Sequence, residues 1–197
     1  MKKVNTKGFV IIILILVVVG LGYYTRLLNQ TKRQSTTTKT EVQQLLEYDF
    51  EENYPKTVRE TVKLHCKYLK NAYGLKFEEE QFPIANSNMR KLYDEELLAY
   101  NSEEQQFEEL KKEISLYKDK KQKFIGYSLE EASQIQYNTE DGKDYAKIEV
   151  TLNITVGTAP VYAEQEYLLR KDESGKWKIL GWQTLQSDSD KNEGNVE

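Results

Sequence analysis

Residues 9–22 form an uninterrupted apolar segment near the start of the chain. They read FVIIILILVVVGLG and contain no charged or strongly polar side chain. With Gly8 and the pair Tyr23–Tyr24 the segment reaches 17 residues, the lower end of the roughly 17–25 that a helix needs to cross a bilayer. Tyrosine rings favour the membrane–water boundary. Because no soluble domain needs a helix that is apolar on every side, we predict a transmembrane anchor over residues 9–28.

The residues that flank this segment indicate whether it is cleaved and how it is oriented in the membrane. Lysines at positions 2, 3 and 7 precede it, as in a signal peptide, and Gly20-Leu21-Gly22 loosely resembles a cleavage site. The alanines preferred at such a site are missing and apolar residues continue to Leu28, so a retained anchor is favoured over a cleaved, secreted form. We expect residues 1–8 to be a cytoplasmic tail and the domain to lie on the extracytoplasmic side, because the short tail carries the denser positive charge.

Composition divides the rest of the chain. Residues 29–40 have no apolar side chain and are rich in Thr, which predicts a flexible linker. From residue 41 onward 21 basic residues face 32 acidic ones, a net charge of −11. A domain with this much negative charge repels the phosphate backbone of DNA and RNA, which argues against nucleic-acid partners. We predict one domain over residues 41–184 and an acidic disordered tail over residues 185–197.

The first half of the domain has the hydrophobic period of helices. We predict helices over residues 41–52, from Pro55 to a C-cap at Gly74, over residues 83–100, and from residue 103 onward. Ser102-Glu103-Glu104-Gln105 is typical of a capping box and opens the last of these helices.

The period then changes from 3.6 to 2, which indicates strands. We predict short strands over residues 123–129 and 133–138, a hairpin turn at Asp141-Gly142, and a long strand in which the residues from Ala146 to Ile154 alternate between apolar and polar. Two further strands follow over residues 161–170 and 177–184. Helices followed by an antiparallel meander predict an α+β domain, with the helices packed on one face of a curved antiparallel sheet.

Three stretches carry a resemblance to a known family. They are Asn53-Tyr54-Pro55-Lys56-Thr57-Val58-Arg59-Glu60, Leu92-Tyr93-Asp94-Glu95-Glu96-Leu97-Leu98, and Arg170-Lys171-Asp172 with Trp177-Lys178-Ile179-Leu180-Gly181-Trp182. They resemble an uncharacterised family from Gram-positive anaerobes whose members have one N-terminal membrane helix and a domain of unknown function. The helical first half and the final strand are also similar to the NTF2-like (cystatin-like) fold, a curved sheet wrapped around helices that often leaves a pocket. The resemblance covers residues 41–184 and implies no activity.

No catalytic, cofactor or metal signature stands out in the sequence. His65 and Cys66 are the only histidine and cysteine, and adjacent positions on a helix point about 100° apart, a poor geometry for a nucleophile pair. Cys66 lies on an apolar stripe and is expected to be a small buried hydrophobe. The acidic runs at 78–80 and 94–96 are interpreted as solvated helix faces. We therefore predict no catalytic residue, no cofactor and no metal site.

Two hypotheses for function remain open. The first is a membrane-anchored extracytoplasmic module that binds a partner protein or a small ligand at the cell envelope, by fold-level analogy with anchored NTF2-like subunits of conjugation machines. The second is an NTF2-like pocket enzyme of the isomerase or hydrolase type that uses Asp and Tyr, with Asp94 among the candidates. The aromatic residues expected to line a pocket in either case are Tyr93, Tyr127, Tyr145, Trp177 and Trp182.

Overall fold

A computed structural model of the chain describes residues 39–185. The predicted cytoplasmic tail, the transmembrane segment at 9–28, most of the linker at 29–40 and nearly all of the acidic tail lie outside the described residues. Within residues 39–185, none of the helices has both the length and the apolar character that crossing a bilayer requires. The predicted anchor therefore stays a prediction.

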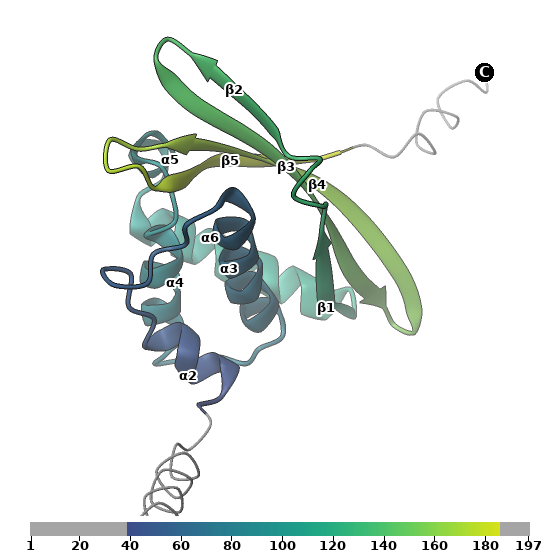
Figure 1. The fold of residues 1–197 in the computed structure, drawn as a ribbon. Coiled ribbons are helices and arrows are strands. Elements are labelled where there is room, and N and C mark those ends of the chain that lie inside the picture. Colours follow the sequence, from purple (N-terminus) through teal and green to yellow (C-terminus); the bar gives the residue numbers. More distant parts are fainter. Residues whose placement is uncertain (1–38, 186–197) are drawn as a thin grey trace, which may run out of the picture. The chain divides into compact units, whose positions relative to one another are not determined.

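Five antiparallel strands form one curved sheet, and helices cover one of its faces (Figure 1). The strands are β1 (Gln122–Leu129), β2 (Gln136–Glu140), β3 (Lys143–Val156), β4 (Ala159–Lys171) and β5 (Trp177–Thr184). The helices are α2 (Glu41–Leu46), α3 (Val58–Tyr73), α4 (Phe82–Arg90), α5 (Glu95–Tyr100) and α6 (Glu103–Asp119). This arrangement confirms the predicted α+β class.

The long strand β3 organises the sheet. Its residues alternate between buried and exposed from Ala146 to Ile154, as predicted, and the buried face is the one that meets the helices. The turn before it is the predicted Asp141-Gly142, where both residues have positive φ, as a type I′ hairpin turn requires.

The sheet departs from the predicted meander at its first two strands. The strands β1 and β2 do not follow one another in the sheet; both pair with the same edge of β3, β1 with residues 150–156 and β2 with residues 143–147. They act as two halves of one interrupted edge strand, because β3, with 14 residues, is long enough to serve both. Its other edge pairs with β4, and β4 pairs with β5.

Helix α3 lies across the sheet and provides most of the helical core. It begins at Val58, so the predicted start at Pro55 is wrong. Thr57 is the N-cap, and a reciprocal capping box with Glu60 satisfies the first backbone N–H groups, which a proline at position 55 does not do. The predicted C-cap at Gly74 is confirmed, but its φ is −78° and the positive φ falls on Leu75. Glycine is needed at 74 because a Cβ there would lie 2.8 Å from the carbonyl oxygen of Lys70.

The predicted helix over residues 83–100 is wrong in its middle. It is two helices, α4 and α5, separated by residues 91–94. The backbone of this linker pairs with β5: Ile179 donates to the Leu92 carbonyl at 2.8 Å, and Asp94 donates to the Ile179 carbonyl at 2.8 Å. The carboxylate of Asp94 then caps α5 by accepting from the backbone N–H of Glu96. Tertiary hydrogen bonds to the sheet thus replace the helical bonds that periodicity predicts.

The remaining two helices differ less from prediction. Helix α2 ends at Leu46 instead of residue 52, because the Asp49 side chain accepts from the backbone N–H groups of Glu51 and Glu52 and turns the chain. Helix α6 begins at the predicted Ser102 cap, whose hydroxyl accepts from the backbone N–H of Gln105.

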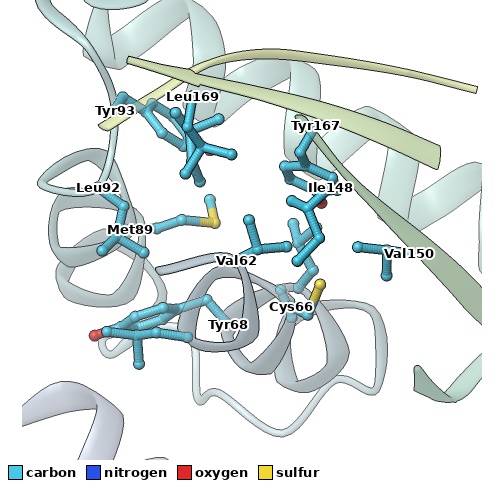
Figure 2. Close-up of a cluster of buried hydrophobic side chains, with 14 of the residues drawn as sticks. Val62, Cys66, Tyr68, Met89, Leu92, Tyr93, Ile148, Val150, Tyr167 and Leu169 are labelled. Carbon is cyan, nitrogen blue, oxygen red and sulfur yellow. The ribbon is translucent and has the colours of Figure 1, made fainter. Parts of the chain in front are cut away.

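The core lies between α3, α4 and the inner face of the sheet. Figure 2 shows Val62 and Cys66 of α3 pointing toward Ile148 and Val150 of β3, with Met89 of α4 beside them. All of these side chains are buried. Since burial of a large apolar side chain contributes about 1.5–3 kcal/mol, this layer is the main source of the domain's stability.

Candidate functional site

A cavity of about 330 Å³ lies between the helices and the curved sheet. Residues from α3, α4, α5 and α6 line one side of it, and residues from β1, β3, β4 and β5 line the other. Most of its wall is apolar, including Leu69, Leu110 and Leu152, with polar groups at a few positions. Its volume lies within the range typical of small-molecule sites, roughly 300–1,000 Å³.

Two of the aromatic residues expected from the sequence, Tyr93 and Trp182, line this cavity. Their rings lie 5.8 Å apart between centroids. The Tyr93 ring is buried, whereas Trp182 remains 40% exposed. Trp182 therefore lies at the boundary between the cavity and solvent, and Tyr93 lies deep in its wall.

The Tyr93 hydroxyl belongs to a buried chain of polar groups centred on His65. Nε2 of His65 lies 3.0 Å from the Tyr93 hydroxyl, and Nδ1 lies 3.2 Å from the Tyr167 hydroxyl. His65 and Tyr167 are completely buried. On the cavity side, Nε2 of Gln106 donates to the Tyr93 hydroxyl at 3.2 Å, and Nη1 of Arg90 donates to Oε1 of Gln106.

The direction of the donors along this chain follows from counting protons. Tyr93 already accepts from Gln106, so its own proton goes to Nε2 of His65, and Nδ1 of His65 carries the ring proton and donates to Tyr167. The thiol of Cys66 lies close to the Tyr167 hydroxyl at the end of this chain. This assignment gives the Tyr93 hydroxyl and the His65 ring N–H one acceptor each, as buried polar groups require.

Burial sets the protonation states of the same groups. It lowers the pKa of His65 to about 3, so the imidazole is neutral at physiological pH. Burial also raises the pKa of Tyr93 and that of Tyr167 above their ordinary values. It raises the pKa of the Cys66 thiol to about 12. The chain is therefore neutral between His65 and Cys66, an arrangement that holds Tyr93 in place.

Gln165 of β4 adds a polar group on the sheet side of the cavity. It lies on the inner face, opposite Val150 of β3 and Thr184 of β5. Its amide oxygen is buried and has no hydrogen-bond partner in the part of the chain that the structure describes. One other described side-chain atom shares this condition, Oδ1 of Asn86 on α4, and it does not line the cavity. Gln165 is thus a half-buried residue whose amide oxygen is buried and has no partner among the described residues.

The other three aromatic residues expected to line a pocket lie elsewhere. Tyr145 and Trp177 border a separate surface hollow together with Tyr137 of β2. Tyr127 of β1 donates its hydroxyl proton to the Lys63 carbonyl at 3.2 Å. The structure therefore brings Tyr93 and Trp182 together and places Tyr127, Tyr145 and Trp177 away from them.

The acidic run at 94–96 is not uniformly solvated, which corrects the prediction. Asp94 is only 3% exposed and binds the guanidinium of Arg170, which also pairs with Glu96 at 3.1 Å. Asp94 does not line the 330 Å³ cavity. The carboxylates that do are Glu109 and Glu113 of α6, both exposed to solvent. No group of three or more His, Cys, Asp or Glu side chains within residues 39–185 has the geometry to hold a metal ion.

Sequence reasoning did not identify most of this site. It did not connect His65 of α3 with Tyr167 of β4, with Gln106 of α6 or with Gln165 of β4. One local signal was available: Gln106, Glu109, Leu110, Glu113 and Tyr117 recur at three- and four-residue steps and share one face of α6. The polar members of that face all line the cavity.

The fold and the cavity define an α+β module in which helices and a curved antiparallel sheet enclose a ligand-sized space. The chain belongs to the family DUF6715, described as a domain of unknown function, whose family model matches residues 1–182. The expectation of a family of unknown function is thereby confirmed.

No curated protein matches the sequence. A solved structure similar to part of the chain is the NMR solution structure of TraH from the Gram-positive conjugative plasmid pIP501, with 17% identity over 68% of this chain and 98% of TraH. The TM-score is 0.37.

Proposed function

We propose that this protein is a single-pass membrane protein with an NTF2-like extracytoplasmic domain that binds a small ligand in the cavity between its helices and its sheet. The observation that carries the proposal is the cavity itself. Apolar side chains from four helices and from the strands β1, β3 and β5 converge on one space of about 330 Å³, and Tyr93, Gln106 and Gln165 add polar groups from the segment before α5, from α6 and from β4. An apolar space with a few placed polar groups is typical of small-molecule sites.

The features of the cavity favour binding over catalysis. A pocket enzyme of the isomerase type needs a desolvated carboxylate beside a hydroxyl donor. The buried carboxylate nearest to Tyr93 in the sequence, Asp94, is bound by Arg170 and lies outside the cavity. The lining carboxylates, Glu109 and Glu113, are exposed. Tyr93 has its proton directed to His65, so it is placed as part of a rigid wall.

A matched pair of substitutions on α5 tests the binding site. Leu97 lines the cavity, while its neighbour Leu98 borders a different hollow, and both are half-buried. The full chain in dodecyl maltoside is screened by ligand-observed NMR against a fragment set of neutral, anionic and cationic compounds. We expect Leu97→Trp to abolish binding of the hits by filling the cavity, and Leu98→Trp to preserve it. If no fragment binds, or if both variants retain the hits, the proposal is wrong.

Membrane placement needs its own test. The apolar segment over residues 9–28 supports an anchor, and the lysine cluster before it supports an extracytoplasmic domain. Protease treatment of intact cells should digest the domain, whereas a domain protected until the cells are lysed would reverse the orientation. N-terminal sequencing of the mature protein distinguishes a retained anchor from a secreted form, because cleavage would produce a chain that starts near Tyr23.

A partner protein at the envelope is the second candidate, and one surface favours it. On the outer face of the sheet, near the turn between β3 and β4, Tyr162 of β4 is exposed by 68% and Ile125 of β1 is exposed by 58%. A photo-crosslinking residue at position 162 should capture a defined protein in native membranes if this surface is an interface. The exposed Tyr137 on β2 is the matched control position.

A further inference from the structure

The face of α6 that borders the cavity carries two negative charges beside aromatic rings. Glu109 and Glu113 are four residues apart, followed by Tyr117 after another four, so all three project from the same side of the helix. All three line the cavity. Like charges at this spacing repel one another, so this face is electrostatically costly unless a cation lies against it.

No side chain of the cavity lining supplies such a cation; Arg90 is not part of the lining and binds Gln106 and the Asn101 carbonyl. The lining contains neither lysine nor arginine. Within residues 39–185, Glu109 and Glu113 have no salt bridge, whereas their neighbour Glu108 pairs with Lys111 at 3.3 Å on the outer side of the helix. Glu109 accepts a hydrogen bond only from the neutral amide of Gln105, at 3.1 Å. The charge of the lining is therefore −2, in a domain that is itself strongly acidic.

Aromatic rings flank the two carboxylates. Tyr117 packs against Tyr73 of α3 with 4.5 Å between ring centroids, and Tyr73 lies 6.3 Å from Phe124 of β1. On the other side are Trp182 and Tyr93. The carboxylate of Glu113 lies close enough to Tyr73 that, after burial, its charge is the next cause that raises the pKa of that hydroxyl. Aromatic faces together with carboxylates are the recognised surroundings of organic cations.

From these contacts we infer that the cavity takes an organic cation: an amine or quaternary ammonium group attached to an apolar body. The charged head would lie between Glu109 and Glu113 and the rings of Tyr73 and Tyr117, and the apolar body would lie against Leu69, Leu110 and Leu152. This inference rests on the proposed function and specifies its ligand class. The acidic domain would also raise the local concentration of such a cation near the cavity.

Three probes of matched shape test the charge requirement. Benzyltrimethylammonium is the cation, neopentylbenzene its neutral carbon isostere, and benzylsulfonate the anion. Binding to the full chain in dodecyl maltoside is followed by the fluorescence of Trp182, in a Trp177→Phe background that leaves it as the sole tryptophan, and by the shift in Tm of the unsubstituted chain. We expect the cation to bind roughly tenfold tighter than either of the other probes.

Two double variants with the same change in net charge locate the effect. Glu109→Gln with Glu113→Gln removes the lining charges, and Glu104→Gln with Glu108→Gln removes two exposed charges of the same helix that do not line the cavity. We expect the first pair to weaken benzyltrimethylammonium binding about tenfold without changing neopentylbenzene binding, and the second pair to leave both unchanged.

The other outcomes separate this inference from the proposal beneath it. Equal or tighter binding of the neutral or anionic probe overturns the cation inference and leaves the ligand cavity standing. A cation preference that persists in the Glu109/Glu113 variant also overturns it, because the cation would then bind elsewhere. No response to any of the three probes overturns it as well, while the fragment screen with Leu97→Trp decides the cavity proposal independently.

Discussion

Arg170 of β4 binds the carboxylate of Asp94, the residue that caps α5. Nε of Arg170 donates to Oδ2 of Asp94 at 3.0 Å, and Nη2 donates to Oδ1, so the contact is bidentate. The same Oδ1 accepts from the backbone N–H of Glu96 at 2.9 Å. One side chain of the sheet thereby fixes the start of a helix and the backbone next to Tyr93. This ion pair links the sheet to the part of the chain that forms the cavity wall.

Removing one charge of this pair should be costly. Asp94→Asn removes the buried anion of the largely buried guanidinium and leaves the exposed Glu96 as its carboxylate partner, and we expect the free energy of unfolding to fall by about 3 kcal/mol. Urea denaturation of the full chain measures it. The control is Glu108→Gln, which removes the exposed pair with Lys111 and should cost no more than about 0.5 kcal/mol. Equal losses in the two variants would contradict a structural role for the Arg170–Asp94 contact.

The buried His65 should make the domain less stable as the pH falls. Its pKa is about 3 in the folded protein and 6.5 in an ordinary environment, so below pH 6.5 the unfolded chain binds a proton that the native protein does not. Stability should therefore fall by about 2 kcal/mol between pH 7.5 and pH 5.0. The rings that pack against His65, those of Tyr93, Tyr167 and Trp182, are neutral.

Urea unfolding at a series of pH values tests this dependence. His65→Gln is the control, because His65 is the only histidine of the chain and its removal should abolish most of the slope above pH 5. An NMR titration adds a direct readout: the ring signals of His65 should stay constant from pH 8 to pH 5. A ring that titrates near pH 6.5 would show that the polar chain is open to water.

Gln165 should be a residue that reduces stability. Gln165→Met keeps the length of the side chain and removes a buried amide oxygen without a partner, so we expect the free energy of unfolding to rise by about 1 kcal/mol. Thermal and urea denaturation measure the change. Gln183→Met, at an exposed position of β5, should alter stability by less than about 0.5 kcal/mol. A destabilised Gln165→Met variant would mean that the amide has an unrecognised role in the fold.

The capping box of α3 should contribute more than the cap of α6. In the capping box the Thr57 hydroxyl accepts a hydrogen bond from the Glu60 backbone N–H, and the Glu60 carboxylate accepts one from the Thr57 backbone N–H. Thr57→Ala removes the hydroxyl, and we expect the free energy of unfolding to fall by about 1 kcal/mol. Ser102→Ala removes the single hydrogen bond from the Gln105 backbone N–H to the Ser102 hydroxyl and should lower the free energy of unfolding by less. Chemical denaturation of both variants compares them directly. A larger loss of stability for Ser102→Ala than for Thr57→Ala would show that the number of capping hydrogen bonds does not determine the stability of these helix ends.

Local patterns predicted α3 and the turn at Asp141-Gly142, whose hydrogen bonds close within the helix or the turn, and each is confirmed. They also predicted β3, whose bonds go to other strands, because its alternation marks one face for burial. The predicted helix over residues 83–100 failed because its central backbone groups bond to Ile179, more than 80 residues away. The period of the hydrophobic residues cannot reveal these competing hydrogen bonds, because their partner lies in another part of the chain.

By itself, the sequence determined the α+β class and the acidic character of the domain, because these depend on spacing and composition. Tertiary structure alone decided which residues meet. It joined His65 to Tyr93 and Tyr167, paired Asp94 with Arg170, and separated Tyr127, Tyr145 and Trp177 from the cavity. Contacts between distant segments depend on how the sheet curves and which strand edges pair, and these are properties of the whole packed domain that no local pattern encodes.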